Sequence, residues 1–468
     1  MKSTAAVCLA LTVWMVSGPA VASTPPAGEV TMFESPAGVA EQCVQVEPAP
    51  GAVLTVSDIA ELPRLCQIDF YAEDVALCPK IWSTSPATIV HRAHGSGSDF
   101  EAQVCARGTH ARDIAAEEMA DYKMSMNGPD TSATFAPAAL LYFHFARWFD
   151  AAVQVPPAVY RSMDRQIHLE RVVAPGEALT ADKESLAMLY AAWLRMAKAH
   201  RDPAAYSERT ELYEPGYKVA YGVLLDERGR RYGPEMNGTR ASGWGKGQNE
   251  DFQRTAPFLA LRASQPLPAA IEQGLAQARR DPVMEQALNG VTPVQVAYWM
   301  RELVDITLLD FIFSQQDRIG NIDYLWRWLW WDQGMLRFSQ RRPDNQAAGK
   351  LRITILNDND AGVRSGYANY ARRTGMLDGW HHIDPGLYQR VQSLAADFSD
   401  AGPVASAVLG NYRLSSREAK GIIKRGIEIA DQLRARCESG ALRIDLSLRN
   451  VLNPGGAEME PVSCSVDR

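Results

Sequence analysis

Residues 309–321 read Leu-Asp-Phe-Ile-Phe-Ser-Gln-Gln-Asp-Arg-Ile-Gly-Asn, and residues 352–362 read Arg-Ile-Thr-Ile-Leu-Asn-Asp-Asn-Asp-Ala-Gly. The first stretch ends an apolar segment that starts near residue 293 and repeats its large side chains at helical spacing, which predicts a long buried helix that stops at a polar loop. The second stretch alternates like a short strand and then turns polar. The pattern therefore predicts a helix, a loop carrying Asp317, a strand, and a second loop carrying Asp358.

These two loops carry the groups that phosphoryl transfer requires. The reaction needs a carboxylate to accept the proton of the nucleophile, and an Asp, often with an Asn, to hold a divalent metal on the phosphates. Asp317, Asn321 and Asp358 supply these groups in the order that kinases use. Two plainer readings stay open: Asp317 could be a helix-ending carboxylate paired to Arg318 or Arg372, and Asn321 could serve only the turn, since Gly-Asn favours turns.

The two stretches resemble the catalytic segment of the atypical secretory-pathway kinases of the Golgi casein kinase type, and more distantly that of HipA-like and phosphoinositide kinases. The shared pattern is Leu-Asp-Phe, then Asp-Arg seven residues after the first Asp, then a strand ending in Asp-Asn before a glycine. Here these are Leu309–Phe311, Asp317–Arg318 and Asp358–Asn359. The resemblance covers residues 294–362 well and the N-terminal part faintly. It implies an α+β, two-lobed protein-kinase-like fold with a small mixed N-lobe and a mostly helical C-lobe.

The resemblance also implies roles for individual residues. Asp317 would be the catalytic base and Asp358 a metal ligand, with Asn321 as a candidate second metal ligand and Asp360 as the fallback for Asp358. The implied cofactors are ATP and Mg²⁺ or Mn²⁺. Lys123 is the candidate that pairs with the nucleotide phosphates, because it precedes a predicted helix and a Val-Pro-Pro exit, in the order of the family.

The N-terminal half departs from the family pattern. Lys80 is the alternative lysine, and the helix predicted after Lys123 contains no Glu to hold a lysine. If Lys80 were the nucleotide lysine, Glu117 or Glu118 could serve it. No Gly-x-Gly-x-x-Gly occurs; the segment Gly95–Gly97 could cover phosphates, but the β-like runs around it favour a hairpin tip.

These departures leave alternatives to an active kinase. Gln315 stands where the family has Asn, two residues before the catalytic Asp. We therefore carry two main hypotheses: an exported atypical kinase that transfers the ATP γ-phosphate to a hydroxyl of a protein or glycan, and a catalytically weak pseudokinase that binds a nucleotide or another ligand. A weaker third hypothesis is a carboxylate-based hydrolase that uses Asp317 with Asp358 or Asp360.

The first residues predict export. Residues 1–22 combine one Lys, a short apolar run and a small-residue triplet, which is typical of a signal peptide cleaved after Ala22 in a secreted or periplasmic protein. The run is shorter than the ~20 apolar residues of a membrane-spanning helix, so we expect no membrane span. The six cysteines that follow could form up to three disulfides in an oxidising compartment. We expect the N-terminal four to pair largely among themselves and the last two to hold the tail; they are Cys43, Cys66, Cys78, Cys105, Cys437 and Cys464.

Composition along the chain suggests its organisation. Residues 23–50 are rich in Pro, Ala and Gly and predict an extended arm. Residues 51–164 would form the N-lobe on the nucleotide side, and residues 165–468 the helical C-lobe with the catalytic loop and the metal-binding Asp. The net charge of −7 and the lack of a Lys/Arg block argue against nucleic acid or an anionic membrane surface as the main partner, and name no other. The resemblance implies a nucleotide and a protein or glycan acceptor.

Two further segments predict surface features. The tryptophans of residues 326–331 alternate as a strand would, so one face is expected in the core and the other on a surface wall, where stacking on a sugar or peptide is an open alternative. Residues 240–253 form a polar, glycine-containing stretch that predicts a lid or surface loop.

Overall fold

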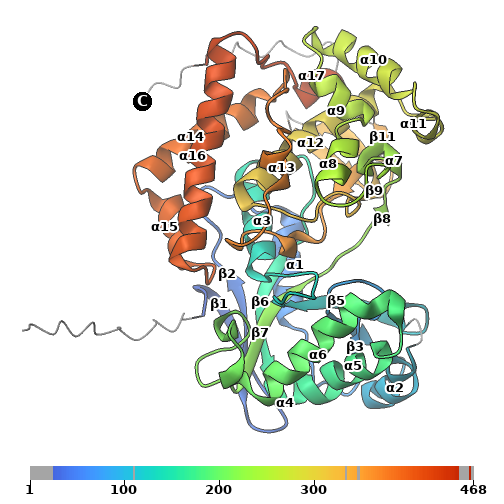
Figure 1. Cartoon of the computed structure of the whole chain (residues 1–468), viewed down its shortest axis with the longest axis vertical. Helices are drawn as coiled ribbons and strands as arrows, with labels where there is room; N and C mark the ends of the chain where they lie inside the picture. Colours follow the sequence, from blue (N-terminus) through green and yellow to red (C-terminus); the bar gives the residue numbers. More distant parts are fainter. Residues whose placement is uncertain (1–24, 109–110, 333–334, 345–347, 453–462, 465–468) are drawn as a thin grey trace, which may run out of the picture.

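The computed structural model describes residues 25–108, 111–332, 335–344, 348–452 and 463–464. The predicted signal peptide, residues 1–22, lies outside them. The described chain forms two lobes, one built on a sheet and one mostly of helices (Figure 1). The expected α+β class, with a mixed N-lobe and a mostly helical C-lobe, is therefore confirmed.

The N-lobe is built on one antiparallel sheet of seven strands, in the order β1-β2-β6-β7-β5-β4-β3. Its strands are β1 (Gly28–Glu34), β2 (Ala40–Val46), β3 (Val75–Pro79), β4 (Thr88–Arg92), β5 (Glu117–Met124), β6 (Ala158–Asp164) and β7 (Val219–Leu225). The helices of this lobe are α2 (Gly97–Gln103), α4 (Arg165–His168), α5 (Ala174–Thr180) and α6 (Ala187–Arg201). The buried apolar side chains of α6 belong to the same core as those of the sheet, and α2 and α4 contact β3 and β6.

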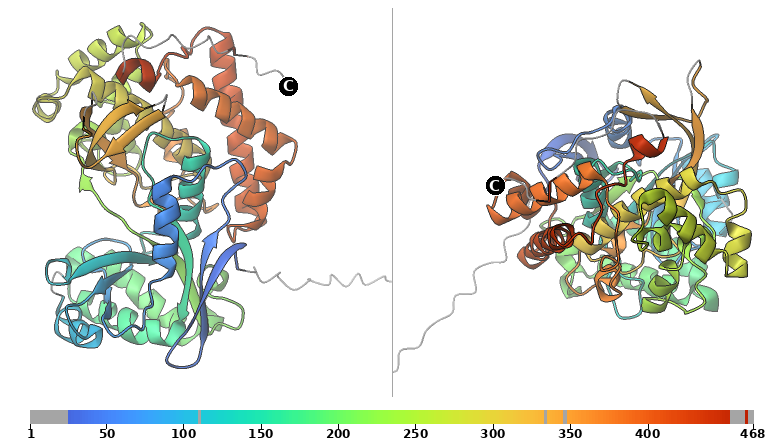
Figure 2. Two further views of the ribbon diagram at one scale, coloured as in Figure 1. Left: turned by 180° about the vertical axis from the view of Figure 1, so that it is seen from behind. Right: turned by 90° about the horizontal axis from the view of Figure 1, so that it is seen from above.

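Two helices connect the lobes. Seen from behind, α1 (Val56–Cys66) and α3 (Pro137–Trp148) stand between the sheet and the helical lobe (Figure 2). Pro137 opens α3 in its first turn, where its missing N–H costs nothing, and nearly every α3 side chain is buried. The helix contacts both the sheet and the central helix of the C-lobe, so one hydrophobic core runs through both lobes.

The predicted boundaries of the N-lobe need two corrections. The extended arm predicted for residues 23–50 is wrong for most of its length, because β1 and β2 lie there and β2 pairs with β6. The N-lobe also continues past residue 164: β7 pairs with both β5 and β6, so the sheet ends only at Leu225. The central strand β7 follows three intervening helices, α4, α5 and α6, so no change in composition marks the end of the N-lobe.

The C-lobe is organised around α12 (Pro293–Phe313), whose side chains are almost all buried. Thr292 caps its start, its Oγ1 accepting from the backbone N–H of Gln295 at 3.2 Å, and the helix ends at Ser314 in the left-handed conformation. Around it lie α7 (Pro234–Asn237), α8 (Lys246–Phe252), α9 (Ala256–Leu261), α10 (Leu267–Ala278), α11 (Pro282–Ala287), α13 (Tyr370–Arg373), α14 (Pro385–Ser399), α15 (Pro403–Gly410), α16 (Ser416–Glu438) and α17 (Leu448–Leu452). The predicted loop at residues 240–253 thus contains α8.

A small antiparallel sheet interrupts these helices, as the sequence predicts. It consists of β9 (Asp323–Asp332), β10 (Met335–Ser339) and β11 (Gly349–Ile355) in the order β10-β9-β11, and the short β8 (Arg230–Arg231) pairs with the start of β9. One face packs into the lobe through Leu329, Leu351 and Ile353. This sheet carries the chain from the end of α12 to the loop of Asp358.

Three disulfides link the described residues, in agreement with the predicted grouping. They are Cys43–Cys66, Cys78–Cys105 and Cys437–Cys464. A disulfide stabilises mainly by restricting the unfolded chain, typically by 2–4 kcal/mol. Over the described ranges, no helix combines the length and apolar character needed to cross a bilayer.

Candidate functional site

A polar cavity of about 230 Å³ contains most of the residues that the sequence singled out. Its walls come from both lobes. The N-lobe supplies Lys80, Trp82, Ser83, Thr84, Ser85, Ser132, Ala133 and Thr134, and the C-lobe supplies Arg231, Asp317, Asn321, Asp358, Asp360 and Ala361. The structure therefore brings the predicted base and all three predicted metal ligands to one place.

Asp317 lies in the loop that follows α12, and a glutamine holds this loop against Asp358. The Oε1 atom of Gln315 accepts from the backbone N–H of Asp317 at 3.1 Å, and its Nε2 donates to the backbone oxygen of Asp358 at 3.3 Å. Burial, and next the charge of Asp358, raise the pKa of the Asp317 carboxyl to about 6 against the opposing charge of Arg318. Asp317 is therefore mostly ionised at physiological pH, as a proton acceptor should be, and its pKa lies close enough to that pH for it to take up a proton.

The plainer reading of Asp317, a carboxylate paired to a neighbouring arginine, is not realised. Arg318 pairs with Asp310, at 3.1 Å between Nε and Oδ2, and Arg372 pairs with Glu428 at 2.8 Å. Within the described part of the chain, Asp317 forms no ion pair. Its charge is therefore not used to hold the fold together.

The buried guanidinium of Arg318 holds together the other residues of the pattern Leu-Asp-Phe, Asp-Arg and Asp-Asn. Besides Asp310, it donates to the backbone oxygen of Asn357 and to Oδ1 of Asn359, both at 2.7 Å. Tyr142 of α3 donates to Oδ1 of Asp310 at 2.7 Å. The Asp of Leu-Asp-Phe, the Arg of Asp-Arg and the Asn of Asp-Asn thus form one scaffold that fixes the two loops to each other.

Asp358 follows β11 in the left-handed backbone region, with φ of 51°. This conformation is uncommon for residues other than glycine, although Asp tolerates it better than most. Burial alone would raise the pKa of Asp358, but the ammonium of Lys123 at 3.1 Å from Oδ1, and then Lys80, hold it well below its usual range. Asp358 is therefore a permanent carboxylate.

Lys123 lies on β5 with only 4% of its surface exposed. Its Nζ donates to Oε1 of Glu227 at 2.7 Å as well as to Asp358. Burial lowers the pKa of Lys123, but Asp360, Glu227 and Asp358 outweigh that effect and keep it well above its ordinary value. Lys123 is therefore a charged ammonium beside the carboxylates of the cavity.

The partner of Lys123 is a residue that sequence reasoning missed. Glu227 lies just after β7 and also accepts from the backbone N–H of Asp358 at 3.0 Å. The two glutamates expected to serve Lys80 are engaged elsewhere on the sheet: Glu117 pairs with Arg92 at 3.6 Å, and Glu118 accepts from Arg112 at 2.6 Å. No local pattern marks Glu227, because its role depends on the pairing of β5 with β7.

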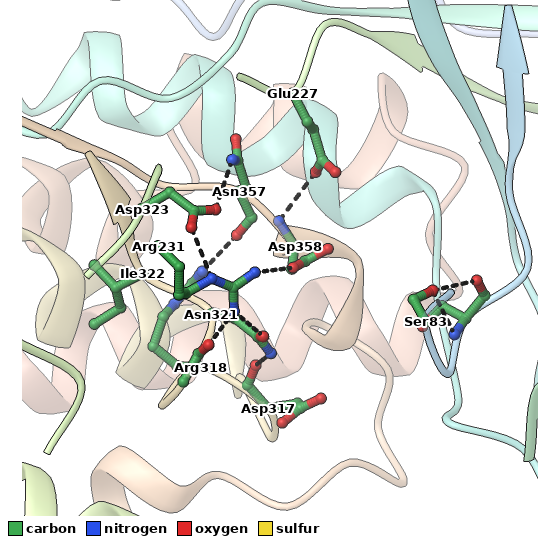
Figure 3. Close-up of polar contacts among 12 residues, drawn as sticks. Ser83, Glu227, Arg231, Asp317, Arg318, Asn321, Ile322, Asp323, Asn357 and Asp358 are labelled. Atoms are coloured by element: carbon green, nitrogen blue, oxygen red, sulfur yellow. Dashed lines mark hydrogen bonds and ion pairs between the residues drawn. The ribbon is translucent and has the colours of Figure 1, made fainter. Parts of the chain in front are cut away.

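Asn321 and Arg231 form a second polar pair in the cavity (Figure 3). Nη1 of Arg231 donates to Oδ1 of Asn321 at 2.6 Å, and also to the backbone oxygen of Gly320. Its Nε donates to Asp323 at 2.7 Å, and its Nη2 lies 3.9 Å from Oδ2 of Asp358. The oxygen through which Asn321 would bind a metal is therefore engaged by a guanidinium.

Asp360 is 5% exposed and lines the same cavity. Burial raises its pKa, Lys123 opposes this, and the charge of Asp358 adds to it. The raised pKa values of Asp360 and Asp317 have the same causes: burial and the neighbouring negative charge of Asp358. A cation entering the cavity would offset that repulsion.

The N-lobe wall of the cavity differs from the predicted one. Ser83, Thr84 and Ser85 lie in the turn between β3 and β4, and Oγ of Ser85 is 2.9 Å from that of Ser132. Gly95–Gly97, the predicted glycine loop or hairpin tip, instead starts α2, where Ser96 caps the helix by accepting from Asp99. The strands β3, β4 and β5 are consecutive in the sheet, so the serine-rich turn and Lys123 belong to one structural unit.

The donor atoms of the cavity suit a hard divalent cation. Asp358, Asp360 and the amide oxygen of Asn321 are oxygen donors, the kind that Mg²⁺ and Mn²⁺ prefer. Across the described ranges there is no group of three or more His, Cys, Asp or Glu side chains placed to hold a metal by themselves. Mg²⁺ commonly needs only one or two carboxylates when substrate phosphates and water complete its shell. The residues present therefore fit a metal that is bound together with a nucleotide.

No protein-family model matches the chain, and no curated protein matches its sequence. Solved structures do match it. A crystal structure of the Golgi casein kinase with Mn/ADP bound is 10% identical, covers 78% of this chain and 73% of its own, and has a TM-score of 0.38. A second crystal structure of the Golgi casein kinase is also 10% identical, covers 85% of this chain and 81% of its own, and has a TM-score of 0.43.

Proposed function

We propose that this protein is an atypical kinase that transfers the γ-phosphate of ATP to a hydroxyl group of a protein or glycan. The observation that carries the proposal is the cavity between the lobes: Asp358 and Asp317 line it, and the buried ammonium of Lys123 contacts Asp358. Phosphoryl transfer depends on positioning and charge stabilisation, and these side chains supply a cation, a metal-binding carboxylate and a base.

Each residue has a defined task in this proposal. Asp317 accepts the proton of the acceptor hydroxyl, and its pKa of about 6 keeps it mostly ionised yet basic at neutral pH. Lys123 binds a phosphate oxygen of the nucleotide. Asp358 would hold the divalent metal, with Asn321 and Asp360 as further oxygen donors, and the metal when bound neutralises phosphate charge. The hydroxyls of Ser83 and its neighbours in the β3–β4 turn face the same space.

We also propose that the protein is exported. The three disulfides persist in an oxidising compartment, and residues 1–22 have the order of charged, apolar and small residues that a signal peptide shows. The mature chain would begin after Ala22. An acceptor hydroxyl on a secreted protein or glycan fits that location.

One observation favours a second candidate, a pseudokinase that binds nucleotide without transferring phosphate. Arg231 engages the Asn321 oxygen and lies near Asp358, so a cation of the protein itself already stands among the metal donors. Metal binding would have to displace it. A pseudokinase of this kind would keep its affinity for nucleotide and lose only the transfer step.

A single set of measurements on the mature protein distinguishes the two. The protein is incubated with γ-labelled ATP and Mn²⁺ without reductant, and phosphate transfer is followed alongside the shift in melting temperature. The kinase proposal expects transfer that Asp317→Asn abolishes and a shift that this variant retains. A shift without transfer supports the pseudokinase, and the absence of both contradicts the nucleotide-binding proposals. Asp431→Asn, a change of an exposed carboxylate on α16, is the control.

A further inference from the structure

The small sheet of the C-lobe has an outer face that carries two tryptophans with cations over their rings. Trp326 and Trp328 are two residues apart on β9, so they point to the same side. Lys350 of β11 pairs in register with Trp328, and its Nζ lies 5.5 Å from the Trp326 ring centroid and 5.9 Å from that of Trp328. Cζ of Arg342 lies 5.3 Å from the Trp328 centroid. We call Trp326, Trp328, Lys350 and Arg342 the tryptophan ladder.

The ladder is not part of the core. The opposite face of the same strands is the buried one, where Leu329, Leu351 and Ile353 pack against Tyr298 of α12. Trp326 on the ladder face is 44% exposed. Figure 2 shows that β9 and β10 reach the edge of the C-lobe. Large aromatic rings held at the surface are typical of contact sites.

The cations of the ladder are free to meet an anion. Nearby arginines have acidic partners: Arg352 pairs with Glu235 at 2.6 Å, and Arg337 with Asp332 at 3.6 Å. Lys350 and Arg342 are exposed and form no ion pair with any residue in the described ranges. Their positive charges therefore face solvent beside the tryptophan rings.

We propose that the tryptophan ladder is a docking site for an acidic polysaccharide. A strand rises about 3.4 Å per residue, so the two rings are spaced about 7 Å apart along a line. The two rings follow each other along one strand, so a linear polymer matches their arrangement better than a compact ligand. Sugar rings offer apolar C–H faces to the tryptophans, and carboxylate or sulfate groups between them meet Lys350 and Arg342.

Other extended ligands fit the ladder less well. A peptide that adds a strand needs a free sheet edge, but β9 is paired on both sides, by β10 and β11. Single-stranded nucleic acid also stacks on aromatic rings, but its binders carry broad positive surfaces, and this chain has a net charge of −7. A uronic-acid chain needs only the two local cations.

The position of the ladder is consistent with a docking role. Asp323, the first residue of β9, accepts from Arg231, which lines the cavity. Trp326 follows three residues later, about 10 Å along the strand. A polysaccharide on the ladder would thus extend along a strand that starts at the edge of the cavity. Binding to the ladder does not depend on nucleotide or on phosphate transfer.

The test measures binding of oligogalacturonate to the mature protein without nucleotide or metal, by calorimetry. Its methyl ester keeps the sugar rings but lacks the charges. We expect the ester to bind about tenfold more weakly. Trp326→Ala should weaken oligogalacturonate binding about fivefold and Lys350→Glu about tenfold, and added salt should reduce the affinity.

Two matched variants lie away from the ladder. Trp244→Ala removes another exposed tryptophan that stacks with an arginine, Arg240, at 5.4 Å, and Lys424→Glu reverses an exposed lysine on α16. Both should leave the affinity within about twofold.

Several results would overturn the proposal. These are the absence of oligogalacturonate binding, equal binding of the ester, equal losses in the control variants, or tighter binding of polyglutamate or oligothymidylate. A concentration-dependent dimer in sedimentation that Trp326→Ala abolishes would also overturn it, because a second copy would then cover the ladder. None of these results depends on whether the cavity transfers phosphate.

Discussion

Replacing Asp317 by Asn should have opposite effects on stability and activity. The carboxyl is largely buried beside Asp358, and its pKa is raised to about 6 from an ordinary value of 3.8. A group with a raised folded-state pKa binds its proton more tightly in the native protein than in the unfolded chain. The free energy of unfolding of the wild type therefore falls as the pH rises from about 4 to about 6, and stays lower above that.

The size of this effect follows from the same interval. One pH unit corresponds to about 1.36 kcal/mol, so the interval from 3.8 to about 6 gives at most about 3 kcal/mol. Asn cannot ionise. Relative to the wild type, Asp317→Asn should therefore gain stability between pH 4 and pH 8, by up to about 3 kcal/mol.

Activity should change in the other direction. A positioned general base contributes about 10²–10⁴ to a rate, so the Asn variant should lose about 3–5 kcal/mol of transition-state stabilisation. The combination is informative because replacing a residue that only supports the fold would lower the stability of the protein. Replacing a catalytic carboxylate that lies in an unfavourable environment should instead lower the activity and raise the stability.

The assay compares urea unfolding at pH 4 and pH 8, in EDTA and without reductant, with phosphate transfer measured separately at neutral pH. Asp431→Asn is the control, since its side chain is 63% exposed and only 3.6 Å from Arg434 on the same helix. A gain for Asp317→Asn that does not grow with pH would show that the carboxyl is not desolvated as the structure has it. A pH-dependent gain with unchanged transfer would refute its role as the base.

Three further changes test the surroundings of the cavity. Arg231→Ala should free the amide oxygen of Asn321 and remove a positive charge near Asp358. Calorimetry should then show that Mn²⁺ binds about three- to tenfold more tightly. Weaker binding would mean that the guanidinium helps to build the metal site. Glu227→Gln should lower the free energy of unfolding by about 2–3 kcal/mol. This is less than the 3–5 kcal/mol typical of a broken buried ion pair, because Lys123 would still be paired with Asp358. An unchanged stability would contradict the ion pair between Lys123 and Glu227. Burial raises the pKa of Glu302 to about 8, so native Glu302 keeps its proton at pH values where the unfolded chain has lost it. The free energy of unfolding should therefore fall by about 1.4 kcal/mol per pH unit between about 4.5 and 8. Glu302→Gln should remove this part of the decline, and an unaltered pH profile would show that Glu302 is ionised in the native protein.

The part of the site that could be predicted from sequence is local. The end of α12 and the end of β11 are marked by the change from apolar periodicity to polar residues, and Asp317 and Asp358 follow these ends directly. Lys123 was predicted from the order of segments around it, and the structure brings it to 3.1 Å from Asp358. The roles of all three in phosphate transfer stay predictions.

The missed parts depend on contacts between distant segments. Glu227 reaches Lys123 only because β7 pairs with β5, and Arg231 reaches Asn321 only because β8 pairs with β9. Neither residue has a neighbour in sequence that reveals its partner. Ser83 and its neighbours escape prediction for another reason: a loop that covers phosphates is expected to carry glycines, whereas the turn beside this cavity carries hydroxyls.

The electrostatics of the cavity support the proposal of an enzyme over that of a passive binding module. Its two central carboxylates, Asp317 and Asp358, are both partly buried, yet their pKa values move in opposite directions because Lys123 contacts Asp358 and not Asp317. Groups whose environments push their pKa values apart are typical of acid–base sites, where one stays charged and the other exchanges a proton. A site that only binds nucleotide gains nothing from an unpaired Asp317 with a raised pKa, which lowers the stability of the fold. Lys123→Met should therefore raise the pKa of Asp358 toward that of its neighbour, and carbon-detected NMR titration of the two carboxyls would measure whether the lysine creates the difference.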